Sequence, residues 1–267
     1  MKKNDDLKIL TVAADKGGVR KTTTTHNYAE WLALEGHSVL LIDEDRSMNL
    51  TRRYILGETP GHTQNIIGLY EGLSIKDGFT PIQVKKNIDL ISSSTEIPQL
   101  EKQLEARIQR ELVLFKWIAK NYQELNSKYD YILIDTRNDN GVLTLNALAA
   151  ADVVIGITDT SVDGYEALDT LKSKVEELNE AYENNAHLVF VAGGVVKKEI
   201  ATKEILKQLS PRPEFIGSFR KNTNMANPET MFAQAERSKR FFREQEDALK
   251  ELTQLFTKIK GVLDGNK

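Results

Sequence analysis

The sequence contains no cysteine and only four histidines among its 267 residues. The absence of cysteine excludes disulfides, thiolate zinc sites and cysteine-held iron–sulfur clusters. The histidines are scattered and lack the spacing of a metal site. No run approaches the roughly 20 apolar residues that a membrane span needs, and the first ten residues lack the apolar stretch of a signal peptide. We therefore expect a cytoplasmic protein with one domain over residues 1–267.

Apolar segments of strand length recur along the chain and are mostly followed by helical patterns. These segments lie at 8–14, 38–43, 129–135, 151–158, 187–196 and 214–219. Their apolar residues are consecutive, which is typical of parallel strands covered on both faces. Helical periodicity occupies 22–36, 97–126, 164–184 and about 229–260, and we expect loops with short helices over 52–80. The pattern predicts an α/β fold, doubly wound, with a mainly parallel sheet and helices on both faces.

The stretch DKGGVRKTTTTH, residues 15–26, joins the first expected strand to the first expected helix. A glycine-rich turn at that point directs backbone N–H groups and the positive end of the helix dipole at one spot, which binds phosphate. Lys21 then supplies a mobile cation and Thr22 a hydroxyl for magnesium. The strict pattern G-x-x-x-x-G-K-[ST] is not met, because Asp15 and Arg20 stand at its glycine positions. Taken alone, the stretch is also compatible with a plain glycine-containing turn.

The segment KGGVRKTT resembles the deviant Walker A motif, K-G-G-x-x-K-[ST]-T, of the ParA/MinD family of ATPases. Three later segments resemble the same family in order and spacing. Residues 37–51 resemble its I-D-x-D-P-Q-x-N strand end, 86–94 a short strand, and 129–152 its I-D-x-P-P and L-T-x-N-A-L-x-A-A-D segment. The resemblance covers roughly residues 8–172. It implies a P-loop NTPase-like fold that binds ATP or ADP with Mg²⁺.

The resemblance also implies roles for single residues. It places Lys21 along the β and γ phosphates, with Thr22 and Asp135 holding Mg²⁺ and Asp43 close to the metal. Asp45 would orient the attacking water. The other implied catalytic residue is Lys16, which would reach the partner's phosphates in a nucleotide-sandwich homodimer. The remaining nucleotide contacts would be Gly17, Gly18, Val19, Arg20, Thr23, Lys221 and Asn222.

Several of these residues also have ordinary interpretations. Asp43 and Asp45 are compatible with helix caps or turns, and Lys16 with a solvated loop cation. Lys221 and Asn222, which would cover the adenine, are almost equally compatible with a solvated loop. The two switch-like loops, one after each of the aspartate-ending strands, depart from the family pattern. This chain has IDTRN where the family has I-D-x-P-P, and DRSMN where the family has D-P-Q-x-N. We expect nucleotide binding to survive these changes and hydrolysis to be slow or differently triggered.

The overall net charge is −3, yet residues 197–243 contain eleven Lys or Arg against five Glu, a local balance of +6. Such an asymmetry is what nonspecific binding to DNA phosphates requires, although a charge run is often only a solvated helix face. The candidate DNA-binding residues are Lys197, Lys198, Lys203, Arg237, Lys239, Arg240 and Arg243.

These features favour a short ParA-type partition ATPase. The resemblance implies that ATP binding forms a homodimer, that the dimer coats nucleoid DNA, and that a centromere-binding ParB-type partner stimulates hydrolysis and release. One alternative is a MinD-like membrane-associated ATPase, because residues 252–267 have the spacing of an amphipathic helix. We expect that segment to pack on its own domain instead. Another alternative is a nucleotide-binding switch with little hydrolysis.

Overall fold

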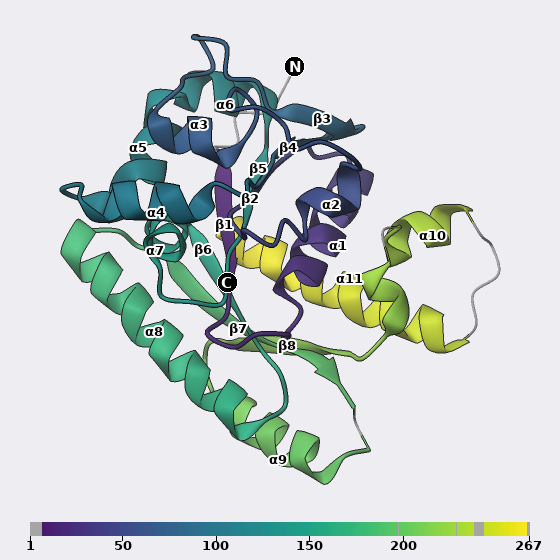
Figure 1. Cartoon of the computed structure of the whole chain (residues 1–267). Coiled ribbons are helices and arrows are strands. Elements are labelled where there is room, and N and C mark those ends of the chain that lie inside the picture. The colour runs from purple at the N-terminus through teal and green to yellow at the C-terminus, as the bar shows by residue number, and fades with distance from the viewer. Residues whose placement is uncertain (1–6, 197, 228, 238–242, 266–267) are drawn as a thin grey trace.

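The computed structural model describes residues 7–196, 198–227, 229–237 and 243–265. The described strands form one sheet in the order β3-β4-β2-β5-β1-β6-β7-β8 (Figure 1). Every neighbouring pair is parallel except β3 with β4. The strands are β1 (Lys8–Ala13), β2 (Val39–Asp43), β3 (Ile82–Lys85), β4 (Ile88–Ile91), β5 (Tyr131–Asp135), β6 (Val153–Thr158), β7 (His187–Val195) and β8 (Phe215–Arg220).

Helices pack on both faces of this sheet (Figure 1). The α-helices in the described ranges are α1 (Lys21–Leu34), α2 (Thr51–Tyr54), α3 (Ile66–Glu71), α4 (Ile97–Glu105), α5 (Val113–Lys120), α6 (Tyr122–Lys128), α7 (Val142–Ala150), α8 (Val162–Tyr182), α9 (Ile200–Leu209), α10 (Met231–Arg237) and α11 (Arg243–Leu263). Two 3₁₀ turns, η1 (Arg110–Leu112) and η2 (Thr223–Ala226), complete the described helical segments.

The alternation of side chains along each strand divides the core in two. On β2, Val39 and Leu41 join the apolar cluster under α1 and α11, whereas Leu40 and Ile42 join the cluster under α3 to α7. All four side chains are fully buried, as expected for a strand covered on both faces. The predicted doubly wound α/β class is therefore confirmed.

The helix predicted over 97–126 is wrong as a single element. The chain leaves α4 after Glu105, and Gln109 adopts a left-handed conformation with φ +54°. The side chain of Asn146 in α7 then donates to the carbonyl of Arg110 and accepts the N–H of Leu114. These tertiary hydrogen bonds hold a turn and a new helix start, which periodicity alone does not reveal.

The apolar face expected at the C-terminal end of the chain is buried against its own domain. Phe256 and Ile259 of α11 are fully buried, and Phe256 lies in ring contact with Tyr28 and Trp31 of α1. The face therefore serves the core, as predicted. No helix among the described residues combines the length and apolarity that crossing a bilayer requires.

Candidate nucleotide site

The carboxyl ends of β2, β5 and β1, which are neighbours in the sheet, bring three loops together. In open α/β sheets this edge is where ligands bind. The loop after β1 runs from Ala14 to Arg20 and leads into α1, so the N–H groups of the first turn of α1 face the same edge. Gly18 in this loop has φ +77°, a conformation that glycine adopts without strain.

Arg20 also adopts a left-handed conformation, with φ 78° and ψ 29°, directly before α1. The loop thus keeps a glycine-like backbone at the position where the strict pattern G-x-x-x-x-G-K-[ST] has glycine. The Arg20 side chain lies against Gly194 of β7: a Cβ added to Gly194 would be 2.5 Å from the Arg20 Nε. Burial lowers the pKa of Arg20.

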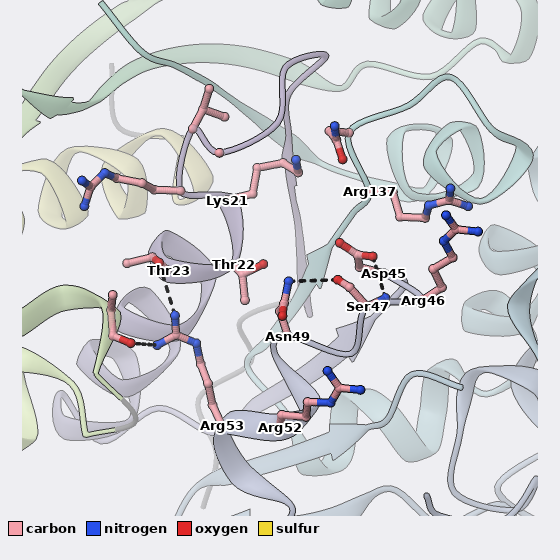
Figure 2. Close-up of a pocket in the computed structure, with 15 residues that line it drawn as sticks. Lys21, Thr22, Thr23, Asp45, Arg46, Ser47, Asn49, Arg52, Arg53 and Arg137 are labelled. Carbon is pink, nitrogen blue, oxygen red and sulfur yellow. Dashed lines mark hydrogen bonds between the residues drawn. The ribbon is translucent and has the colours of Figure 1, made fainter. Parts of the chain in front are cut away.

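A cavity of about 670 Å³ opens beside this loop (Figure 2). Its size lies within the range of small-molecule sites, roughly 300–1,000 Å³. Of the residues that the structure describes, six with cationic side chains and one with a carboxylate line its wall, which suits a strongly anionic ligand. The lining residues are Gly18, Val19, Arg20, Lys21, Thr22, Thr23, Asp45, Arg46, Ser47, Asn49, Arg52, Arg53, Arg137, Asn138 and Ala226.

Lys21 begins α1 and is 8% exposed. Burial lowers the pKa of its ammonium group, and the nearby carboxylates of Asp135 and Asp45 partly oppose this change. A buried cation beside a cavity is a ready contact for a phosphate group.

Thr22 donates a hydrogen bond to the Asp135 carboxylate over 2.6 Å, and Thr25 donates to its other oxygen over 3.1 Å. Asp135 pairs in register with Asp43 across β5 and β2, and both side chains are fully buried. Burial raises the pKa of Asp135 to about 6 and that of Asp43 to about 7, and the mutual repulsion of the two charges adds to the shift of Asp43.

The oxygen donors of Thr22, Asp43 and Asp135 fit the chemistry of Mg²⁺, which binds through one or two carboxylates together with phosphates and water. A bound cation would favour the charged forms of these two buried carboxylates and offset their mutual repulsion. Among the described residues, no group of three or more His, Cys, Asp or Glu is placed to hold a metal alone. Phosphate and water ligands would have to complete the site.

Asp45 lies in the loop after β2 and lines the cavity, where its carboxylate accepts the N–H of Ser47 over 2.9 Å. Its own N–H donates to Asp43, and its carbonyl accepts the Ser93 hydroxyl over 2.7 Å. The loop is therefore fixed to the strand that carries Asp43 and to the segment after β4.

Lys16 is turned toward β6 and α8, and it is absent from the cavity wall. Its ammonium lies 2.9 Å from the carboxylate of Asp159 and donates to the Ser161 hydroxyl over 2.6 Å. In this conformation the Lys16 ammonium is engaged in interactions within its own chain and is not directed at the cavity.

Lys221 and Asn222 precede η2, and neither lines the cavity. Ala226, at the end of η2, does line it. Arg53 of α2 donates to the Ala226 carbonyl over 3.4 Å and to the Thr23 hydroxyl over 3.3 Å, so it connects η2 to α1. Eight described residues of the wall were not predicted from the sequence: Arg46, Ser47, Asn49, Arg52, Arg53, Arg137, Asn138 and Ala226. Arg46, Arg137 and Asn138 could have been found, because each differs from the residue that the family pattern has at its position.

Of the candidate DNA-binding residues, Lys198 and Lys203 are exposed at the start of α9. Lys197, Lys239 and Arg240 lie outside the described residues, as do the side chains of Arg237 and Arg243. Two other arginines of the basic segment are engaged within the chain. Arg212 pairs with Asp169 and Arg220 with Glu251, which reduces the cationic surface that the segment presents.

The fold and the loop at its carboxyl edge define the P-loop NTPase class. Residues 7–190 match the AAA_31 family, described as an AAA domain. The chain belongs to this family, which is of ParA/MinD type, and the predicted family is confirmed.

The chain is 32% identical over 170 residues to the sporulation initiation inhibitor protein Soj of Bacillus subtilis, covering 63% of this chain and 64% of Soj. The match therefore spans just under two thirds of that relative. A crystal structure of a plasmid partition protein from Borrelia burgdorferi superposes with a TM-score of 0.73 at 27% identity, covering 96% of this chain and 98% of that one. A second partition protein structure, from B. burgdorferi B31 and bound to AMPPNP, gives 0.73 at 26% identity and covers 95% and 99%.

Proposed function

We propose that the chain is an ATP-dependent partition ATPase whose nucleotide occupies the cavity between the loops after β1, β2 and β5. The observation that carries the proposal is the wall of this cavity, where Lys21 and Thr22 follow a glycine-containing turn and Thr22 donates to the buried Asp135 behind it. Phosphoryl transfer asks the protein mainly for positioning and for cations where negative charge develops. The family membership and the AMPPNP-bound structure of a partition protein support this assignment.

In this proposal the backbone from Gly17 to Thr23 wraps the phosphates and Lys21 lies along the β and γ groups. Mg²⁺ held beside Thr22, Asp43 and Asp135 would neutralise phosphate charge. Asp45 orients the attacking water from a loop that Ser93 and Asp43 hold in place.

ATP would also join two copies of the chain. For Lys16 to reach a partner's phosphates it must leave Asp159 and Ser161. Both Lys16 and Asp159 are about one third exposed, and exposed ion pairs contribute only about 0–1 kcal/mol, so this exchange costs little. The dimer would bind DNA nonspecifically through cations that include Lys198 and Lys203, and a ParB-type partner would stimulate an otherwise slow hydrolysis.

The test compares wild type, Lys21→Ala and the matched control Lys116→Ala, whose lysine is exposed on α5 and does not line the cavity. Calorimetry with Mg²⁺ should show ATP uptake by wild type and control and a loss of at least about 100-fold for Lys21→Ala. Binding to unrelated duplex DNA should require ATP and weaken steeply with salt.

The double substitution Lys198→Ala/Lys203→Ala should retain ATP uptake and reduce DNA affinity and its salt dependence. DNA binding that is equal with and without nucleotide would refute the partition mechanism. Absence of nucleotide uptake by wild type would refute the ATPase assignment itself.

A further inference from the structure

Two positions at which the chain departs from the family pattern both carry arginine. Arg46 follows Asp45 in DRSMN, and Arg137 stands two residues after Asp135 in IDTRN. The two loops are far apart in the sequence, yet both arginines line the same cavity. Figure 2 draws both side chains at the edge of the cavity where Asp45 lies.

Arg137 is held in position by its own chain. Its guanidinium contacts Glu101 of α4 over 2.8 Å and Asp139 over 2.9 Å, and the side chain is 19% exposed. Asp139 in turn accepts the N–H of Gly141 over 3.0 Å and the hydroxyl of Thr144 over 3.1 Å. A buttressed guanidinium at a cavity wall is pre-organised for an anion, because little rotamer entropy remains to be lost.

Arg46 has a contrasting environment. Its side chain is exposed, and among the described residues it makes no hydrogen bond or ion pair. It extends from the loop whose backbone is tied to Ser93 through the Asp45 carbonyl. The arginine can therefore swing toward an anion while the loop that carries it stays in place.

Two other cations of the wall are already engaged within the chain. Arg53 donates to the Thr23 hydroxyl and to the carbonyl of Ala226. Burial lowers the pKa of Arg53, although it is close enough to Asp135 for that carboxylate to oppose this change. Arg20 lies along Gly194. The Lys21 ammonium is close to both Asp135 and Asp45, and the wall beside these carboxylates also carries Arg46 and Arg137 (Figure 2).

We propose that Arg46 and Arg137 bind the terminal phosphate of ATP from within the same chain, so that the two loops distinguish ATP from ADP. This inference rests on the proposed nucleotide function and specifies which residues recognise the third phosphate. Guanidinium groups form charge-assisted, planar hydrogen bonds to phosphate oxygens, which an ammonium group reproduces incompletely.

The test measures the affinities of AMPPNP and ADP, each with Mg²⁺, for five proteins: wild type, Arg46→Ala, Arg137→Ala, Arg137→Lys and the control Arg107→Ala. Arg107 is exposed and does not line the cavity, so its substitution removes the same charge elsewhere. Arg46→Ala and Arg137→Ala should each weaken AMPPNP at least about tenfold and leave ADP within about twofold. Arg137→Lys should recover part of the loss, and the control should match wild type.

Because Arg46 is exposed and unpartnered among the described residues, Arg46→Ala keeps the test decisive even if Arg137→Ala is unstable. An unchanged preference for AMPPNP, or an equal loss of both nucleotides, in Arg46→Ala would overturn the inference while leaving the nucleotide site intact. If wild type and Arg107→Ala bind neither nucleotide, the proposed function fails, and the inference with it.

Discussion

Replacing Asp135 with asparagine should stabilise the nucleotide-free protein while weakening or abolishing the proposed binding of magnesium. Asp135 is fully buried, and its pKa rises from 3.8 to about 6 because burial penalises the charged form. Asparagine has the same shape, and both partners of Asp135 are threonine hydroxyls, Thr22 and Thr25, which can donate or accept. The substitution therefore removes the charge while a hydrogen bond to each threonine can be kept.

The magnitude follows from the difference in pKa. Each unit is worth about 1.4 kcal/mol, so the shift of Asp135 corresponds to roughly 3 kcal/mol against folding when the group is ionised. Since the folded-state pKa is raised, this penalty is present above about pH 6 and disappears as the pH falls toward 4. This shift already includes the attraction between the carboxylate and the buried Lys21, so we expect a net gain of up to about 3 kcal/mol at pH 8.

Urea denaturation in EDTA at pH 8 and near pH 4.5 measures this difference, which should fall from its full value at pH 8 to roughly a third of that value at pH 4.5. Asp89→Asn is the matched control. Asp89 is also buried, but it accepts the Tyr129 hydroxyl and pairs with Lys128, so its substitution should destabilise the protein. The reasoning is refuted if Asp135→Asn destabilises at pH 8, or if its gain is the same at both pH values.

Asp135→Asn should also have opposite effects on the stability of the free protein and on the binding of ADP with Mg²⁺. ADP with Mg²⁺ should raise the melting temperature of wild type, since a ligand that binds only the folded state stabilises it. Asp135→Asn should show a smaller rise, or none, although it starts from a higher melting temperature in EDTA. Equal shifts in both proteins would mean that Asp135 does not contribute to the metal site.

Three further substitutions test other parts of the structure. Asp159→Asn should free Lys16 and strengthen ATP-dependent dimerisation up to about fivefold in analytical ultracentrifugation; unchanged association would contradict the role given to Lys16. Gly194→Ala should destabilise by about 1–3 kcal/mol in urea, because the new Cβ meets Arg20 at 2.5 Å and φ is +73°, and Arg20→Gly should restore part of that loss. Phe256→Ala should cost about 3–5 kcal/mol in the same assay, because the ring is fully buried, and a loss below 1 kcal/mol would show that α11 contributes little to the core.

Consecutive apolar residues identified the parallel strands well. Residues 39–43 illustrate this: each side chain of β2 is buried, so the whole strand reads as one apolar run ending in Asp43. The edge strand β3 was not predicted, because its side chains alternate between partly buried and exposed and its antiparallel pairing depends on a turn at Asn87 with φ +65°. The other edge strand, β8, is parallel to its neighbour and was predicted at 214–219, so it is the short, half-exposed antiparallel strand that the sequence does not reveal.

The candidate site divides in a similar way. Lys21, Thr22, Asp43 and Asp135 were predicted from the family resemblance, and the structure has them at the ends of strands or the start of a helix, where sequence order fixes their place. The contributions of Arg53 and Ala226 could not, because their approach depends on how α2 and η2 pack around α1. Tertiary contacts between short, irregular segments leave little periodicity to read.

Arg20 shows how a departure in one motif can be accommodated by a residue far along the chain. A left-handed conformation costs a non-glycine residue about 1–2 kcal/mol, yet the loop adopts it at Arg20. The long side chain finds room only because Gly194, some 170 positions later, has no Cβ to occupy that space. The loop thus keeps the left-handed backbone of the P-loop without glycine at position 20, and glycine is needed instead at position 194 of β7. A motif search restricted to the loop would score Arg20 as a mismatch, whereas in the structure Arg20 packs against Gly194, which leaves space for its side chain.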